Sequence, residues 1–184
     1  MRVAFVTLRA DPDDAPPGAQ RLRCVAENLA TRGHEVTVFC SQWWDGDIDA
    51  FEYQDVTYRR VYREPESGPF VRRLPFVLRS AAPEVIHVRH EPPLAVVAAR
   101  VAGVALQTPI IADWWTVPSG STGRLRTASY RLAARLPKLS TVPSETCRTG
   151  VREFGASRET TRIVPEGIDF SLVEEASVDR RADI

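Results

Sequence analysis

The sequence predicts an α/β fold: a doubly wound, mostly parallel Rossmann-like sheet with helices on both faces. Seven short apolar runs, several of them rich in β-branched residues, are typical of strands that are covered on both sides. Segments with apolar residues at helical spacing separate several of these runs, and this succession favours right-handed crossovers between parallel strands. The length of 184 residues suits one domain of ordinary size.

The elements follow from local patterns. The predicted strands are 3–8, 35–40, 56–61, 85–88, 110–112, 139–142 and 162–164. The first predicted helix, 19–32, repeats apolar residues at positions i, i+3, i+4, i+7 and i+8 and is followed by Gly33, a typical helix stop. Further helices are predicted at 94–104 and 144–154, the latter with Ser144 as N-cap and Gly155 as stop.

Composition excludes several classes of protein. Basic and acidic residues balance at 24 each, so no nucleic-acid partner is expected. The three cysteines form no C-x-x-C pair, which indicates free thiols and a cytoplasmic protein. The longest apolar stretch, 94–106, contains Arg100 and is too short to span a bilayer, so we expect a soluble protein. The spacing of His87, His90 and Glu91 does not match a zinc site, and no metal is expected.

A parallel sheet of this kind binds ligands beyond the carboxyl ends of its strands. The first loop there contains one glycine, Gly18, in place of G-x-G-x-x-G, and no P-loop motif is present, so a bound dinucleotide cofactor is not expected. Gly18 could still let a phosphate approach the helix N-terminus, assisted by Arg21. The alternative is that Pro-Pro-Gly is only a turn before the helix.

Other candidates lie at the same edge. His87 and His90 end the fourth predicted strand and could orient a substrate or act as acid–base groups, or could be purely structural. Two tryptophan pairs, Trp43–Trp44 and Trp114–Trp115, follow predicted strands. We expect one residue of each pair in the core, while the other could offer its ring face to a sugar or lipid tail.

Two basic stretches suggest a membrane-facing or lipid-phosphate-binding patch. In residues 119–138 no acidic residue occurs, and helical spacing places three arginines close together beside a leucine stripe. In residues 69–79 arginines alternate with Phe70 and Phe76, both of which we expect to be exposed. Basic side chains combined with apolar ones suit an anionic membrane surface, and the alternative is an ordinary solvated helix face. The proposed patch comprises Arg72, Arg73, Arg124, Arg131 and Arg135.

Four segments, in order, resemble the N-terminal domain of retaining glycosyltransferases of family 4. The first runs from Gly-Ala-Gln-Arg at 18–21 to Leu-Ala-Thr-Arg-Gly-His-Glu-Val-Thr-Val-Phe at 29–39. Pro-Glu-Val-Ile-His at 83–87 is similar to the family's P-D-V-I-H strand, and Val-Pro-Ser-Glu at 142–145 is similar to its V-x-S-E helix start. Ile-Val-Pro-Glu-Gly-Ile-Asp at 163–169 is similar to its V-V-P-N-G-V-D turn.

The resemblance implies one half of a two-domain GT-B fold. It implies an acceptor-binding domain over residues 1–170, followed at 171–184 by a linker or the start of a C-terminal donor domain, present in cis or in trans. The resemblance covers the first domain only and not the donor domain, which carries the family's donor-binding E-x7-E motif, so this chain is not expected to transfer sugar alone. The complete enzyme would move a sugar from a nucleotide sugar to an acceptor hydroxyl with retention. The nucleotide sugar is then a co-substrate, and no cofactor is implied.

The resemblance also suggests site residues. Where the family commonly has a histidine near the reacting sugar, this sequence has Trp115, or Trp114 after a one-residue shift, which leaves Asp113 and Trp115 as catalytic candidates. The substrate-binding candidates are Gly18, Arg21, His87, His90, Trp114 and Glu166, the last standing where asparagine is usual. A lipid-linked acceptor would place the protein at the inner membrane face. The alternative function is a stand-alone, non-catalytic Rossmann-like binding module.

Overall fold

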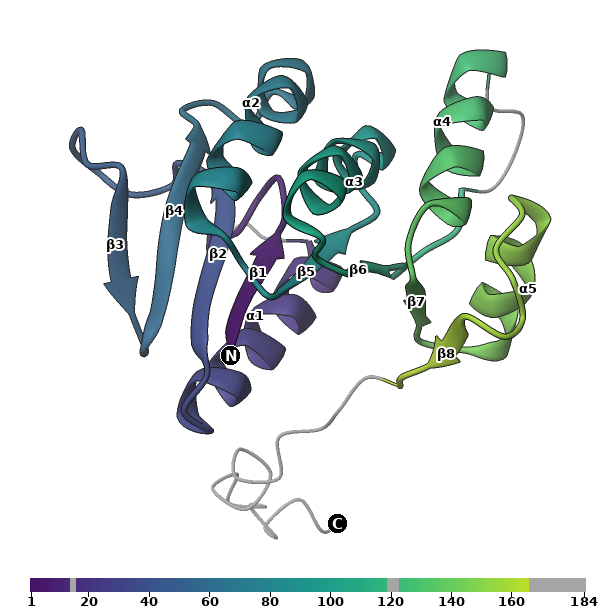
Figure 1. The fold of residues 1–184 in the computed structure, drawn as a ribbon, viewed down its shortest axis with the longest axis horizontal. Helices are drawn as coiled ribbons and strands as arrows, with labels where there is room; N and C mark the ends of the chain where they lie inside the picture. Colours follow the sequence, from purple (N-terminus) through teal and green to yellow (C-terminus); the bar gives the residue numbers. More distant parts are fainter. Residues whose placement is uncertain (14–15, 119–122, 166–184) are drawn as a thin grey trace, which may run out of the picture.

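The computed structural model describes residues 1–13, 16–118 and 123–165, which form an eight-stranded sheet with helices on both faces (Figure 1). The strand order is β3-β4-β2-β1-β5-β6-β7-β8, and every pairing is parallel except that of β3 with β4. The strands are β1 (Arg2–Val6), β2 (Glu35–Ser41), β3 (Ala50–Tyr53), β4 (Val56–Tyr62), β5 (Val85–Arg89), β6 (Ile110–Asp113), β7 (Leu139–Val142) and β8 (Thr161–Ile163). The predicted fold class and all seven predicted strands are confirmed.

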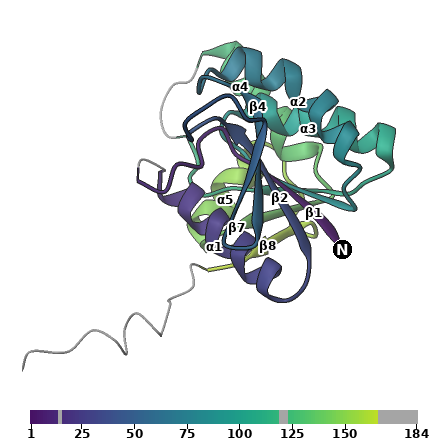
Figure 2. The ribbon, with the colours of Figure 1, turned by 90° about the vertical axis from the view of Figure 1, so that its left-hand side faces the viewer.

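Two helical layers enclose the sheet. The helices are α1 (Pro17–Thr31), α2 (Ser67–Ala81), α3 (Pro93–Leu106), α4 (Arg124–Arg135) and α5 (Glu145–Glu153). Helices α2, α3 and α4 cover one face, and α1 and α5 lie on the other (Figures 1 and 2). One hydrophobic core lies under the first layer and a smaller one lies between α1 and β1, β2 and β4.

Local chemistry sets the helix ends. The Ser144 hydroxyl accepts a hydrogen bond from the Cys147 amide at 3.2 Å, as expected of an N-cap. Gly33 and Gly155 follow α1 and α5 with φ values of 82° and 102°, a conformation that favours glycine. Both predicted helix stops are thereby confirmed.

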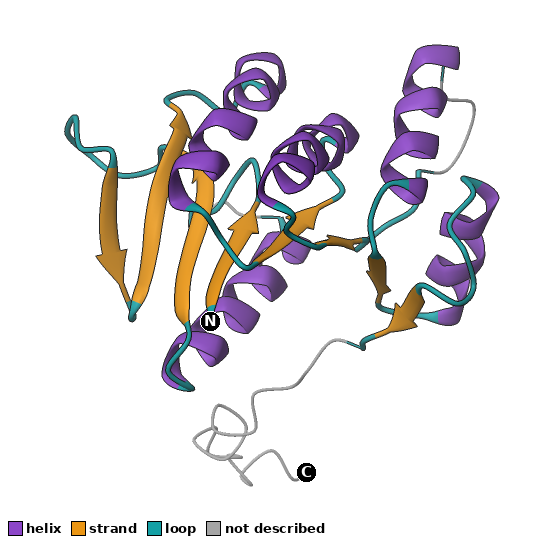
Figure 3. Ribbon diagram, viewed as in Figure 1, coloured by secondary structure: helices purple, strands orange, loops and turns teal. Residues whose placement is uncertain are grey.

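Three elements, β3, α2 and α4, are additional to the predicted strands and helices (Figure 3), although helical spacing within 119–138 already grouped the arginines of α4. Strand β3 is a short, mostly exposed edge strand joined to β4 by Gln54 and Asp55, both at positive φ, which suits a tight hairpin turn. Helix α2 contains Pro75, a residue that normally argues against a helix interior. Its apolar face nonetheless buries side chains four residues apart, and the expectation that Phe70 is exposed is wrong because its side chain is fully buried.

Within the described residues, none of the helices combines the length and apolarity that crossing a bilayer demands.

Candidate functional site

Polar side chains from four elements meet at the carboxyl edge of the sheet. The parallel register sets Arg89 of β5 beside Asp113 of β6, and Asp113 beside Thr141 of β7. Because these strands end at the same edge, their last residues face the N-terminus of α1. The edge is therefore where the fold concentrates charged groups.

Asp113 is the centre of this cluster, and its side chain is only 4% exposed. Its Oδ1 accepts a 2.6 Å hydrogen bond from the Thr141 hydroxyl and lies 4.0 Å from His87 Nε2. Its Oδ2 lies 3.8 Å from Nε of Arg21. A buried carboxylate is costly unless hydrogen-bond donors or positive charges lie next to it. The contacts that Asp113 makes for this reason link β6, its own strand, to α1, β5 and β7.

Arg21 connects this cluster to the segment after β8. Its guanidinium donates a hydrogen bond to the Pro165 carbonyl oxygen at 2.9 Å while facing Asp113. Burial lowers the pKa of His87, the Asp113 carboxylate opposes this shift, and the Arg21 charge lowers the pKa further. His87 is therefore neutral at neutral pH, with an imidazole nitrogen that can accept a proton.

His90 and Trp114, both predicted to bind substrate, lie in the core of the structure. Both side chains are fully buried, and their rings stack with centroids 4.5 Å apart. The His90 Nδ1 atom lies 3.2 Å from the Asp113 carbonyl oxygen, and burial lowers the pKa of His90 to about 3. Tyr130 packs beside both rings, so the pair anchors the loop after β6 on α4.

Gly18 and Trp115 are in close contact. A Cβ atom added to Gly18 would lie 2.8 Å from both Cβ and Cγ of Trp115 and 3.3 Å from Nε of Arg89. Only glycine therefore allows the first turn of α1 to approach the loop after β6 this closely. Trp115 is half-buried, in contrast to Trp114, which bears out the expectation that one residue of this pair is in the core.

Two adjoining hollows open along the carboxyl edge. One, of about 420 Å³, lies between the loop after β1, the end of β5 and α4, and includes Arg89, Arg126 and Tyr130 in its lining. The other, of about 280 Å³, lies beside the end of β2 and includes Ser41 and Trp43. Trp43 and Trp44 are both half-buried and pack on Phe51, so neither is wholly in the core, contrary to expectation for this pair.

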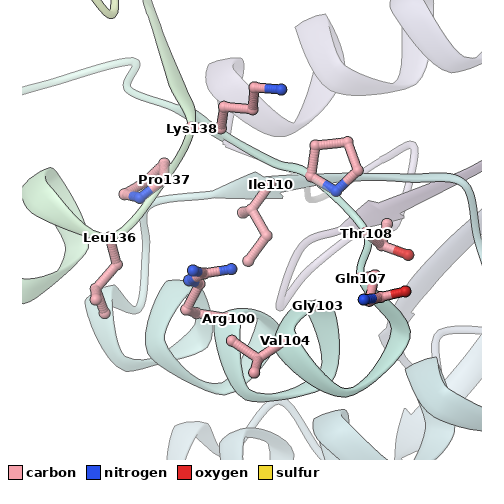
Figure 4. Close-up of a pocket in the computed structure, with 10 residues that line it drawn as sticks. Arg100, Gly103, Val104, Gln107, Thr108, Ile110, Leu136, Pro137 and Lys138 are labelled. Carbon is pink, nitrogen blue, oxygen red and sulfur yellow. The ribbon is translucent and has the colours of Figure 1, made fainter.

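A larger hollow, of about 480 Å³, lies at the opposite edge of the sheet (Figure 4). Arg100, Val104 and Lys138 line it, where α3 and α4 end and β6 begins. Lys138 lies just beyond the C-terminus of α4, where the helix dipole favours a cation, whereas Arg100 is in the middle of α3. This hollow is at the amino edge, away from Asp113.

The basic residues gather on the outer surface of the α2–α4 layer. The buried face of α4 is formed by Tyr130, Ala133 and Ala134, so its arginines and leucines point outward, and Leu125 is 90% exposed. Phe76 of α2 is 74% exposed. The predicted patch residues Arg72, Arg73, Arg124, Arg131 and Arg135 are all exposed, although Arg135 also lies against Gly155.

The structure brings together Gly18, Arg21, His87, Asp113 and Trp115. It separates this cluster from the basic patch, and Glu166 lies outside the described residues. The sequence analysis missed Arg89 and Thr141. Arg89 directly follows an apolar strand run, a position that could have drawn attention to it, whereas Thr141 lies inside a strand and gives no such signal.

Metal ligands are not grouped in the described part of the chain, where no set of three or more histidine, cysteine, aspartate or glutamate side chains could hold an ion.

The comparisons with known proteins decide the family. The family model described as Glycosyltransferase Family 4 matches residues 18–172. The chain belongs to glycosyltransferase family 4. The matched range of this glycosyltransferase domain includes the residues that meet at the carboxyl edge, from Gly18 to Pro165. No curated protein sequence matches the chain.

Solved structures show the same fold at low sequence identity. Sucrose-phosphate synthase from Thermosynechococcus elongatus superposes with a TM-score of 0.72 at 17% identity, covering 93% of this chain and 49% of that one. HepE from Anabaena, in complex with UDP-glucose, superposes with a TM-score of 0.68 at 16% identity, covering 94% and 45%. The family 4 domain thus spans about half the length of these proteins and corresponds to one half of a GT-B fold.

A UDP-N-acetylglucosamine 2-epimerase from Rickettsia bellii also shares the fold. Its TM-score is 0.60 at 13% identity, and the match covers 90% of this chain and 45% of that one. Because an epimerase and transferases share this architecture, fold alone does not fix the reaction.

Proposed function

We propose that this chain is the acceptor-binding half of a retaining glycosyltransferase that moves a sugar from a nucleotide sugar to an acceptor hydroxyl. The family match over residues 18–172 carries the proposal. We assign residues 1–170 to the acceptor domain and 171–184 to the start of a connection to a donor domain. That donor domain, in cis or in trans, would hold most of the nucleotide sugar, so the chain alone would be inactive.

The carboxyl-edge cluster supports this role because it offers groups suited to the reaction. Transfer breaks the bond between the anomeric carbon and a diphosphate oxygen, and forms a bond from that carbon to the acceptor oxygen, which loses its proton. Neutral His87 could accept a proton, and Asp113, whose Oδ1 lies 4.0 Å from His87 Nε2, would orient the ring and stabilise the charge that forms. Arg21 and the N-terminus of α1 at Gly18 place positive charge where the departing diphosphate gains negative charge.

Trp115 would act as a wall of the acceptor site. It is the half-buried member of its pair and lies against Gly18, near which Nε of Arg89 also lies. An aromatic ring face suits the apolar C–H surface of a sugar ring. The reaction needs no metal in this scheme, because the positive charge comes from the protein.

The outer surface of the α2–α4 layer supports a peripheral membrane location. Arg72, Arg73, Arg124 and Arg131 are exposed there together with Leu125 and Phe76. Basic residues near an anionic leaflet contribute roughly 1 kcal/mol each, which suits reversible attachment at the inner membrane face. An acceptor linked to a membrane lipid would then be available to the domain. Sedimentation with anionic but not neutral vesicles tests this, and equal sedimentation with both would contradict it.

Sugar transfer by the complete gene product tests the main proposal. The protein is incubated with labelled UDP-glucose and parallel panels of soluble and lipid-linked acceptors, and the anomeric configuration of the product is read by NMR. We expect transfer with retention, with the 184-residue chain inactive alone. Nucleotide-sugar turnover without any glycosylated product would favour another reaction on the same fold.

A further inference from the structure

The hollow of about 420 Å³ at the carboxyl edge, lined in part by Arg89, has an unusual charge balance. Three arginines and one glutamate line it, and they come from the loop after β1, the end of β5 and the beginning of α4. These residues are Arg9, Arg89, Glu91 and Arg126. Among the residues that the structure describes, the walls therefore carry more arginine than carboxylate side chains, although the whole chain is neutral.

Arg89 is the innermost of these cations and is only 6% exposed. One terminal nitrogen bonds Oε2 of Glu91 at 3.1 Å, while Nε is buried without a hydrogen-bond partner. The Glu91 side chain is 41% exposed, so it is a partly solvated partner for a buried charge. A buried guanidinium with an unused donor is costly unless a further acceptor approaches it.

Arg126 stands at the rim of the hollow on the first turn of α4. Its guanidinium carbon lies 5.7 Å from the centre of the Tyr130 ring, and a terminal nitrogen lies 3.4 Å from the Tyr130 hydroxyl. A neutral phenol orients the guanidinium without cancelling its charge. Arg126 is thus held in place and retains its charge for a second partner.

The start of α3 adds positive potential on a third side. Pro92 and Pro93 line the hollow, and α3 begins at Pro93 with no acidic residue in its first turn. Pro92 and Pro93 carry no amide hydrogen, and the Ala95 amide donates to the Pro92 carbonyl oxygen at 2.8 Å, so the helix dipole adds only a weak positive potential here. The main positive charges that converge on this space are those of Arg89 and Arg126.

We propose that this hollow binds a phosphate group carried by the acceptor. The inference rests on the proposed function and specifies its substrate class. Arginine forks match the several oxygens of a phosphate, and contacts from more than one direction suit a tetrahedral group better than a flat carboxylate. The phosphate can belong to a soluble sugar phosphate or to a lipid, which present the same chemistry to Arg89 and Arg126.

Binding to the 184-residue chain tests the proposal through two probes. Glucose 6-phosphate is titrated against glucose by NMR, and vesicles of phosphatidylcholine with or without phosphatidic acid are compared by sedimentation. The variant Arg126→Met removes the charge but keeps an apolar stem at an exposed position. The control Arg152→Met makes the same change at an exposed position of α5, on the other face of the sheet.

We expect either glucose 6-phosphate or the vesicles with phosphatidic acid to bind the chain. The affinity for that probe should fall roughly tenfold or more in Arg126→Met and stay within twofold of wild type in Arg152→Met. Equal binding of glucose and glucose 6-phosphate, with no Arg126-dependent vesicle binding, would overturn the inference. So would phosphate binding that both variants weaken alike. Transfer by the complete protein to an uncharged acceptor would leave the proposed function intact, whereas Arg126-dependent phosphate binding without any transfer would overturn that function alone.

Discussion

Replacing Gly18 by alanine tests the contact that closes the site between α1 and the loop after β6. The new methyl carbon would lie 2.8 Å from Cβ and Cγ of Trp115, well inside van der Waals contact. Trp115 Cβ is next to the backbone, so relief requires the loop or the first turn of α1 to move. Such overpacking costs about 1–3 kcal/mol, and the lower entropy of unfolded alanine offsets about 0.4–1 kcal/mol of that. We expect a net loss of about 1–2 kcal/mol in the free energy of unfolding, measured by urea denaturation.

Gly68 provides a matched control. It is the second residue of α2, as Gly18 is of α1, and an added Cβ would meet nothing within 4 Å. Gly68→Ala should therefore raise stability by about 0.4–1 kcal/mol. If Gly18→Ala proved as stable as Gly68→Ala, the close approach of α1 to Trp115 would be refuted.

Other predictions concern single groups. Thr141→Val removes the hydrogen bond to the buried Asp113 carboxylate and should lower the free energy of unfolding by about 1–3 kcal/mol, read from the urea midpoint. Thr141→Ser keeps the hydroxyl and should retain most of the stability. Equal losses in the two variants would contradict the hydrogen bond. Burial lowers the pKa of His90 to about 3, so the unfolded chain binds a proton that the native chain does not, and stability should fall as the pH drops from about 6.5 towards 3. His90→Phe should reduce this dependence by up to about 1.4 kcal/mol per pH unit, measured by urea denaturation at pH 7 and 5, and an unchanged slope would argue against a buried, neutral His90. Phe70→Ala should cost about 3–5 kcal/mol and Phe76→Ala less than about 0.5 kcal/mol in thermal or urea unfolding, and similar losses would contradict the orientation of α2.

Much of the fold could be predicted from the sequence because its strands are buried on both faces. Such strands are continuous apolar runs, and the helix stop at Gly33 and the cap at Ser144 have local causes. Helix α2 could not be predicted in the same way because Pro75 lies within it. Its stability comes from burying Phe70 and its neighbours against α3 and β4, which is tertiary information.

The candidate site was predictable only in outline. The rule that ligands bind at the carboxyl ends of parallel strands selected the strand ends at which His87 and Asp113 meet in the structure. The rule could not distinguish Trp114 from Trp115, because which of two adjacent side chains points inward depends on the local path of the loop. Arg89 and Thr141 join the cluster only through the pairing of β5, β6 and β7, which a single sequence does not reveal.

The most direct test of the central claim, that the Asp113 cluster serves sugar transfer, is kcat/KM for the acceptor in the complete protein carrying Asp113→Asn. This change keeps the shape of the side chain but removes the charge that faces His87 and Arg21. Glu84→Gln, at the amino edge of the sheet, is the control. A loss of about 100-fold or more for Asp113→Asn, with Glu84→Gln near wild type and both proteins folded, is the predicted result. Transfer within twofold of wild type in the folded Asp113→Asn protein would contradict the account.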